Sequence, residues 1–71
     1  MYLLDNPLND REREIITYIA QGYTAKSIAR MVGLEHRTIE VYVANIRRKL
    51  FAKNTAHAVY IASQRKFLKN K

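Results

Sequence analysis

Residues 24–50 read TAKSIARMVGLEHRTIEVYVANIRRKL, and their pattern predicts the two central helices of the domain. Thr24 is a favourable N-cap residue for a helix over 25–32, and Gly33 is a residue type that commonly ends one. A second helix is expected over 36–50. Its apolar positions recur at intervals of four, three and four residues, as a single buried stripe requires: Ile39, Val43, Ile46 and Leu50. A helix, a short glycine-containing turn and a second helix together predict a helix-turn-helix.

Two further helices flank this pair. Asn9 can cap a first helix, Glu12 completes the pattern of a capping box, and Gly22 provides a terminator. Asn54 and Thr55 are cap-type residues that predict the start of a last helix. Glycine and proline are rare in the chain, which favours helix throughout. The sequence therefore predicts an all-α, four-helix domain with helices at about 9–21, 25–32, 36–50 and 55–67.

The last predicted helix has two partly apolar faces. One face contains Ala56, Val59, Tyr60, Ser63 and Phe67. The other contains Ala58, Ile61, Ala62 and Arg65. Two such faces are more than the core of a small monomer needs, so one of them is expected to meet a partner helix.

The charge of the chain is positive and unevenly distributed. The net charge is +7, with four basic and five acidic side chains in residues 1–35 but nine basic and one acidic in residues 36–71. This asymmetry favours a polyanionic partner, with nucleic acid first and an anionic membrane surface second. A basic surface that only solubilises the domain is the alternative.

Several other classes of function have no support in the sequence. There is no cysteine and no His-x₃₋₅-His pair, so neither a disulfide framework nor a structural metal is expected. No glycine-rich phosphate loop and no nucleophile with a neighbouring base is present, so no enzyme and no cofactor are predicted. No apolar run is long enough to span a membrane, and no signal peptide is visible, which favours the cytoplasm. At 71 residues the chain is expected to form one domain over 8–67, with a linker remnant at 1–7 and a basic tail at 68–71.

In a DNA-binding helix-turn-helix, the second helix enters the major groove. Here that helix is the one over 36–50, and its apolar stripe would anchor it so that the opposite face stays free. That free face is expected to carry Arg37, Glu40, Val41, Ala44, Arg47 and Arg48.

Four blocks of sequence resemble the C-terminal domains of LuxR/FixJ-type regulators. LNDREREI at 8–15 resembles their L-T-x-R-E-x-E-V opening, and AQGYTAKSIA at 20–29 resembles A-x-G-x-x-N-K-E-I-A. TIEVY at 38–42 resembles T-V-[KE]-x-H, and IRRKL at 46–50 resembles I-x-x-K-L. The resemblance covers about residues 8–62 and keeps the order of the blocks.

The resemblance implies a bacterial transcription regulator that binds double-stranded DNA sequence-specifically, usually within a larger parent protein. It places Glu40, Val41 and Ala44 at the base-reading positions. It places Lys26, Thr38, Arg48, Lys49 and Lys53 against phosphates, and charge alone adds Arg37 and Arg47. It places Ala56, Val59, Tyr60 and Ser63 in a homodimer interface. RNA polymerase is a further candidate partner, in the cytoplasm at the nucleoid.

Alternatives remain open at individual positions. The carboxylate of Glu40 could accept a hydrogen bond from cytosine, or it could only be solvated near a helix start. Val41 and Ala44 could contact thymine methyl groups, or they could be small residues that permit close approach. Two departures from the family pattern are Glu35 in place of a common serine cap and Phe51 in place of a frequent glycine. A protein-interaction module with little DNA reading of its own is the alternative function.

Overall fold

The computed structural model describes residues 6–69, which form four helices and no strand. The helices are α1 (Asp10–Ala20), α2 (Ala25–Val32), α3 (His36–Lys49) and α4 (Thr55–Gln64). The expected all-α, four-helix fold is confirmed, and the first three helices differ from their expected bounds by one residue at most. Within the described residues, no helix has the length and apolar character that a membrane crossing needs.

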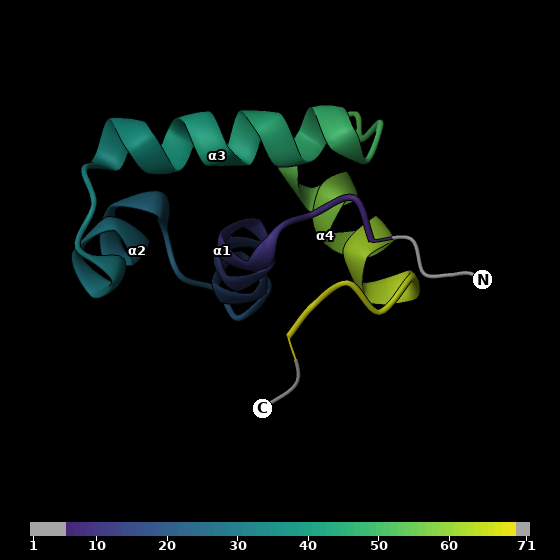
Figure 1. Ribbon diagram of the computed structural model, residues 1–71, viewed down its shortest axis with the longest axis horizontal. Helices are drawn as coiled ribbons and strands as arrows, with labels where there is room; N and C mark the ends of the chain where they lie inside the picture. The colour runs from purple at the N-terminus through teal and green to yellow at the C-terminus, as the bar shows by residue number, and fades with distance from the viewer. Residues whose placement is uncertain (1–5, 70–71) are drawn as a thin grey trace.

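Helix α3 lies along one side of the molecule, and the other three helices pack below it (Figure 1). In this view α2 lies under its beginning, α1 under its middle and α4 under its end, so the outer side of α3 is left open. The core between them is built from buried side chains of all four helices. They include Ile15, Ile16, Ile28, Ala29, Ile39, Ile46, Ala58 and Ala62.

Three of the four helices begin with a side-chain cap. Asn9 and Glu12 form the expected capping box at α1, where each side chain accepts a hydrogen bond from the backbone N–H of the other residue. Thr24 accepts from the N–H of Ser27 at α2, and Asn54 accepts from the N–H of His57 at α4. Glu35 precedes α3 and makes no side-chain capping bond, so α3 depends on packing more than on its cap.

Each helix is followed by one residue with a left-handed backbone. These residues are Gly22, Gly33, Phe51 and Lys66, with φ angles of 99°, 76°, 56° and 61°. At α3 the N–H of Phe51 donates to the carbonyl of Arg48, and the N–H of Ala52 donates to that of Arg47. This pair of bonds is a Schellman motif, in which glycine is the usual left-handed residue because it has no Cβ. Phe51 and Lys66 therefore adopt a backbone conformation that is unfavourable for residues with a Cβ.

The end of α4 differs from the sequence expectation. The helix stops at Gln64 rather than near residue 67, because the left-handed Lys66 reverses the chain. The N–H of Phe67 donates to the carbonyl of Ala62 at 2.7 Å, and the Phe67 ring is buried in the core. Phe67 thus does not share the exposed face of the helix with Tyr60.

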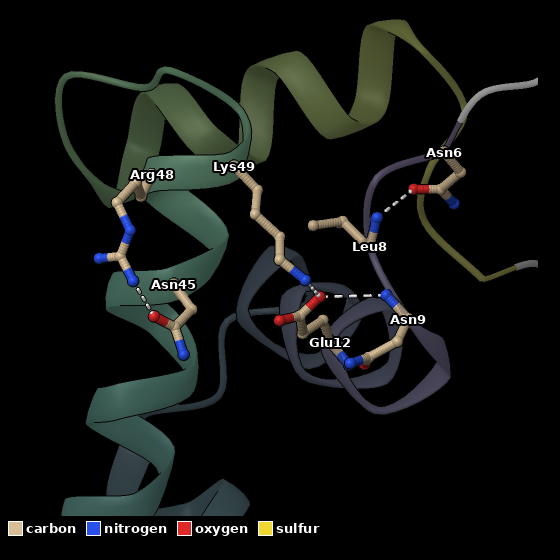
Figure 2. Close-up of polar contacts among 7 residues, drawn as sticks. All are labelled: Asn6, Leu8, Asn9, Glu12, Asn45, Arg48 and Lys49. Atoms are coloured by element: carbon tan, nitrogen blue, oxygen red, sulfur yellow. Dashed lines mark hydrogen bonds and ion pairs between the residues drawn. The ribbon is translucent and has the colours of Figure 1, made fainter.

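The ends of the chain are partly integrated into the domain. Leu8 is buried, and its N–H donates to Asn6 Oδ1 (Figure 2). Leu68 is half-buried, and the N–H of Lys69 donates to the hydroxyl of Thr17 in α1. The remaining parts of the expected linker and tail, residues 1–5 and 70–71, lie outside the described residues.

Replacing Phe51 by glycine is expected to stabilise the domain by about 1 kcal/mol, since glycine removes the Cβ strain of the left-handed region. The phenylalanine ring is 90% exposed, so its loss removes little packing. Urea unfolding followed by circular dichroism measures the difference. Phe51→Ala is the control, because alanine keeps the strain and lacks the ring. Equal stabilisation by both variants would assign the effect to the exposed ring instead.

Candidate nucleic-acid interface

The outer face of α3 is exposed along its whole length. The buried side of the helix contains Ile39 and Ile46, which have no solvent exposure, and it continues into the buried Leu50 after the last turn. Because the helix repeats every 3.6 residues, the opposite side points away from α1, α2 and α4. All six residues expected on this face are exposed: Arg37, Glu40, Val41, Ala44, Arg47 and Arg48.

Small and apolar side chains occupy the middle of this face. Val41 is 55% exposed, and Ala44 is exposed one helical turn further on. Between the cations at either end, these two positions carry small apolar side chains, and Glu40 is the charged neighbour. A second macromolecule can therefore approach the backbone of α3 closely there.

The carboxylate of Glu40 has a partner on its own helix. Glu40 Oε2 lies 3.4 Å from His36 Nε2, one turn earlier, and both side chains are at least half exposed. A polar contact this exposed stabilises the helix little. Glu40 is therefore free to leave His36 for another hydrogen-bond donor, such as a base.

A hollow of about 370 Å³ flanks the outer face of α3. It is lined by Ile19, Tyr23, Ala25, Glu40, Val43, Ala44, Arg47 and Thr55. The Tyr23 ring packs edge-on against Tyr18 with 5.7 Å between centroids, and it remains 46% exposed. Tyr23 and Thr55 were not expected at this site from the sequence, since only the packing of α1 and α4 beside α3 brings them there.

Exposed positions on α2, on α3 and just after α3 hold four of the cations expected to contact phosphates. They are Lys26, Arg37, Arg47 and Lys53. Arg48 is also exposed, and its guanidinium donates to Asn45 Oδ1 on the same helix (Figure 2). Arg47, Arg48 and Lys49 end α3, where positive charge also interacts favourably with the helix dipole. Thr38 is half-buried at the beginning of the helix.

Lys49 has an internal contact that the sequence did not suggest. Its ammonium donates to Glu12 Oε1 at 2.8 Å, joining α3 to α1 (Figure 2). The Glu12 residue is 3% exposed, and the same oxygen accepts from the N–H of Asn9. The charge of Lys49 therefore compensates a buried carboxylate, and that role is structural.

The residues expected in a dimer interface share the open side of α4. Ala56, Tyr60 and Ser63 are exposed, and Val59 is half-buried. The opposite side of the helix presents Ala58 and Ala62 to the core, where both are fully buried. Of the two apolar faces in the sequence, the core takes Ala58 and Ala62 of the second, whereas Ala56, Tyr60 and Ser63 of the first remain exposed.

Groups of three or more His, Cys, Asp and Glu side chains able to hold a metal do not occur within residues 6–69. The two histidines have local roles there. His36 lies beside Glu40, and His57 Nδ1 accepts a hydrogen bond from the N–H of Lys53 at 2.9 Å.

The chain is similar to known regulatory proteins over nearly all of its length. It is 32% identical over 69 residues to the transcriptional regulatory protein DesR of Bacillus subtilis, a match that covers 97% of this chain and 35% of DesR. The fold resembles the transcription factor GerE with a TM-score of 0.86, at 23% identity, over 92% of this chain and 97% of that one. It also resembles the Vibrio cholerae VqmA dimer solved in the absence of its target DNA, with a TM-score of 0.79 at 32% identity, over 84% and 26% of the two chains.

The chain spans about a third of the length of DesR and about a quarter of VqmA. Residues 6–62 match the family model described as bacterial regulatory proteins, luxR family. This match includes α1, α2, α3 and most of α4, and thus both helices of the helix-turn-helix. The chain therefore belongs to the luxR family of bacterial regulatory proteins.

Proposed function

We propose that this domain binds double-stranded DNA sequence-specifically in bacterial transcription regulation, with α3 in the major groove. The main support for this proposal is the outer face of α3. This face is exposed, its side chains at Val41 and Ala44 are small, and cations lie at both of its ends. The major groove of B-DNA accommodates one α-helix and displays a different donor and acceptor pattern for each base pair. Membership of the luxR family supports the same conclusion.

Base reading is assigned to three side chains of that face. Val41 and Ala44 are small enough to contact thymine methyl groups, and the carboxylate of Glu40 can accept a hydrogen bond from cytosine N4. To contact the base, Glu40 must give up its contact with His36. Because that contact is exposed, its loss costs little free energy.

Phosphate contacts are assigned to side chains around the reading face. They are Lys26, Arg37, Thr38, Arg47, Arg48 and Lys53. Such contacts position the protein and contribute a salt-dependent part of the affinity, but they do not discriminate between sequences. Lys49 is assigned to Glu12, so its charge is compensated within the domain and it is not assigned to a phosphate. Tyr23 and Thr55 join this set as neighbours of Arg47 in the flanking hollow.

The active form is proposed to be a homodimer through α4, with Ala56, Val59, Tyr60 and Ser63 in the interface. The support is the exposed face of α4, where Tyr60 is 61% exposed, together with the dimeric state of VqmA. Two domains related in this way would contact half-sites about one turn of DNA apart.

The proposed setting of this activity is the bacterial cytoplasm, at the nucleoid, with RNA polymerase as a further partner. The relatives are about three times as long as this chain, so the proposed domain would serve as the DNA-binding part of a longer regulator.

A protein-interaction module is the second candidate function. It is favoured by the carboxylate of Glu40, which lies on the reading face and repels phosphate, and by the open apolar face of α4. In this case the chain would pair through α4 with another regulator and would show no sequence preference among duplexes.

Selection of duplexes from a random pool, followed by binding titrations at several salt concentrations, tests the proposal. We expect a selected duplex to bind more tightly than a scrambled one, with two chains for each selected site. Arg48→Ala is expected to weaken binding to both duplexes by roughly 3- to 10-fold and to reduce the slope of log affinity against log salt by about 0.9.

Arg65→Ala is the matched control, because it removes the same charge from an exposed residue at the end of α4, outside α3. Its salt slope should remain that of the unsubstituted chain. If no duplex is enriched by selection, or if Arg48→Ala and Arg65→Ala have equal effects, α3 does not dock on DNA as proposed.

A further inference from the structure

A second hollow lies on the side of the molecule away from α3, where the chain leaves α4. It has a volume of about 410 Å³ and is lined by Arg13, Ser63, Lys66 and Leu68. In Figure 1 the segment after α4 lies on the opposite side of the domain from the outer face of α3. A duplex bound along α3 therefore cannot reach this hollow on the same domain.

The walls of the hollow are held in place by hydrogen bonds between α1 and the segment after α4. Arg13 Nε donates to the carbonyl of Phe67 at 2.9 Å, and the N–H of Lys69 donates to Thr17 Oγ1 at 2.8 Å. The buried ring of Phe67 anchors the same segment to the core. The hollow is thus formed before any ligand binds, which reduces the entropic cost of binding.

Its lining combines two cations with a hydroxyl and an apolar side chain. Arg13 is oriented through Nε, which leaves its two terminal nitrogens for another acceptor. Within residues 6–69, ion pairs join Arg11 to Glu14 and Lys49 to Glu12, and a polar contact joins His36 to Glu40. None of these contacts engages Arg13 or Lys66.

Lys66 is also one of the two residues other than glycine with a left-handed backbone in the described part of the chain. Strained residues of this kind are concentrated at functional sites in proteins. Two backbone hydrogen bonds hold this turn, from the N–H of Lys66 to the carbonyl of Ser63 and from the N–H of Phe67 to that of Ala62, and they place Lys66 at the edge of the hollow.

We propose that this hollow binds a carboxylate of an acidic protein segment, at a site separate from the DNA-binding face. Arg13 and Lys66 are the primary anion contacts, Ser63 donates a further hydrogen bond, and Leu68 contacts the aliphatic part of the bound side chain. The volume falls within the range of about 300–1,000 Å³ typical of organic ligand sites, which is larger than one phosphate ion needs. The apolar wall likewise favours an acidic side chain with its backbone over a free inorganic anion.

Titration of the 71-residue chain with hexaglutamate, followed by amide chemical shifts, tests the inference. Saturable changes are expected at Arg13 and at residues 63–68. Arg13→Gln and Lys66→Gln should each weaken binding about fivefold, the effect of one partly exposed charge pair. Arg30→Gln is the control, because it removes one charge from an exposed position on α2.

Two further arms identify the occupant. Inorganic phosphate alone should cause no saturable change at residues 63–68, and equal saturation by phosphate would replace the acidic segment by a free anion. Hexaglutamate should still cause saturable changes at Arg13 and Lys66 when duplex is present, because of the lining residues only Ser63 belongs to the proposed dimer face. Loss of the changes at Arg13 on addition of duplex would overturn the separate site. If Arg30→Gln weakens hexaglutamate binding equally and its thermal midpoint of unfolding is unchanged, the binding depends only on the net charge of the chain. None of these measurements depends on duplex recognition alone. A negative result at the hollow therefore does not contradict the proposed DNA binding.

Discussion

Replacement of Ala44 by glutamate is expected to lower the affinity for the selected duplex about 100-fold, since a misplaced contact costs about 1–3 kcal/mol and the new carboxylate also repels phosphate. Ala44 is exposed at the middle of the reading face, where a longer side chain meets no core residue. The domain should therefore fold as before. Fluorescence anisotropy with the selected duplex measures the affinity, and circular dichroism measures the helix content.

The control for this variant is Gln64→Glu, which changes the net charge by the same amount at the last residue of α4. This control distinguishes an effect of the position of the carboxylate from an effect of the net charge. We expect its affinity to fall no more than twofold, because exposed charges farther apart than the Debye length of about 8–10 Å are largely screened. If Ala44→Glu retains the affinity of the unsubstituted domain, the centre of α3 does not face the groove.

Replacement of Lys49 by methionine is expected to destabilise the domain by about 2–3 kcal/mol, because it leaves the buried carboxylate of Glu12 without its cation. The value is set below that of a fully buried pair because the Lys49 side chain is 39% exposed. A domain of this length has a total stability of only about 4–10 kcal/mol, so the loss is a large share of it. Urea unfolding at neutral pH measures the change.

A double-mutant cycle with Glu12→Gln isolates the contribution of the pair. Glu12→Gln keeps an acceptor for the N–H of Asn9 and removes the buried charge, so methionine at 49 should cost much less in that background. An additive pair of substitutions would show that the contact between Glu12 and Lys49 contributes nothing to stability. The cycle also matters for DNA binding, since a weaker affinity in Lys49→Met reflects the loosened contact between α1 and α3.

The helices could be predicted from the sequence because their determinants are close together along the chain. The capping box of Asn9 and Glu12, the cap at Thr24 and the terminator at Gly33 each act within four residues. The spacing of the apolar residues in α3 is equally local, and it identified which face of the helix is buried. The outward direction of Glu40, Val41 and Ala44 follows from that periodicity alone.

The end of α4 was not predictable in this way. Its pattern continues as far as Phe67, but the helix stops at Gln64 because burial of the Phe67 ring in the core favours a reversed chain. That reversal requires a left-handed Lys66, which the residue type does not favour. Tertiary packing here overrides the local preference.

The residue pattern alone predicts four helices, a basic outer face on the third of them and a domain of the luxR type. Three features arise only once the helices pack: Lys49 neutralises Glu12, Tyr23 and Thr55 flank the reading helix, and Arg13 and Lys66 line one hollow. The two kinds of feature differ in their range along the chain. Caps and helical periodicity depend on neighbours within one turn, whereas these contacts join residues 37 to 53 positions apart, or place residues from different helices side by side, once the core has packed.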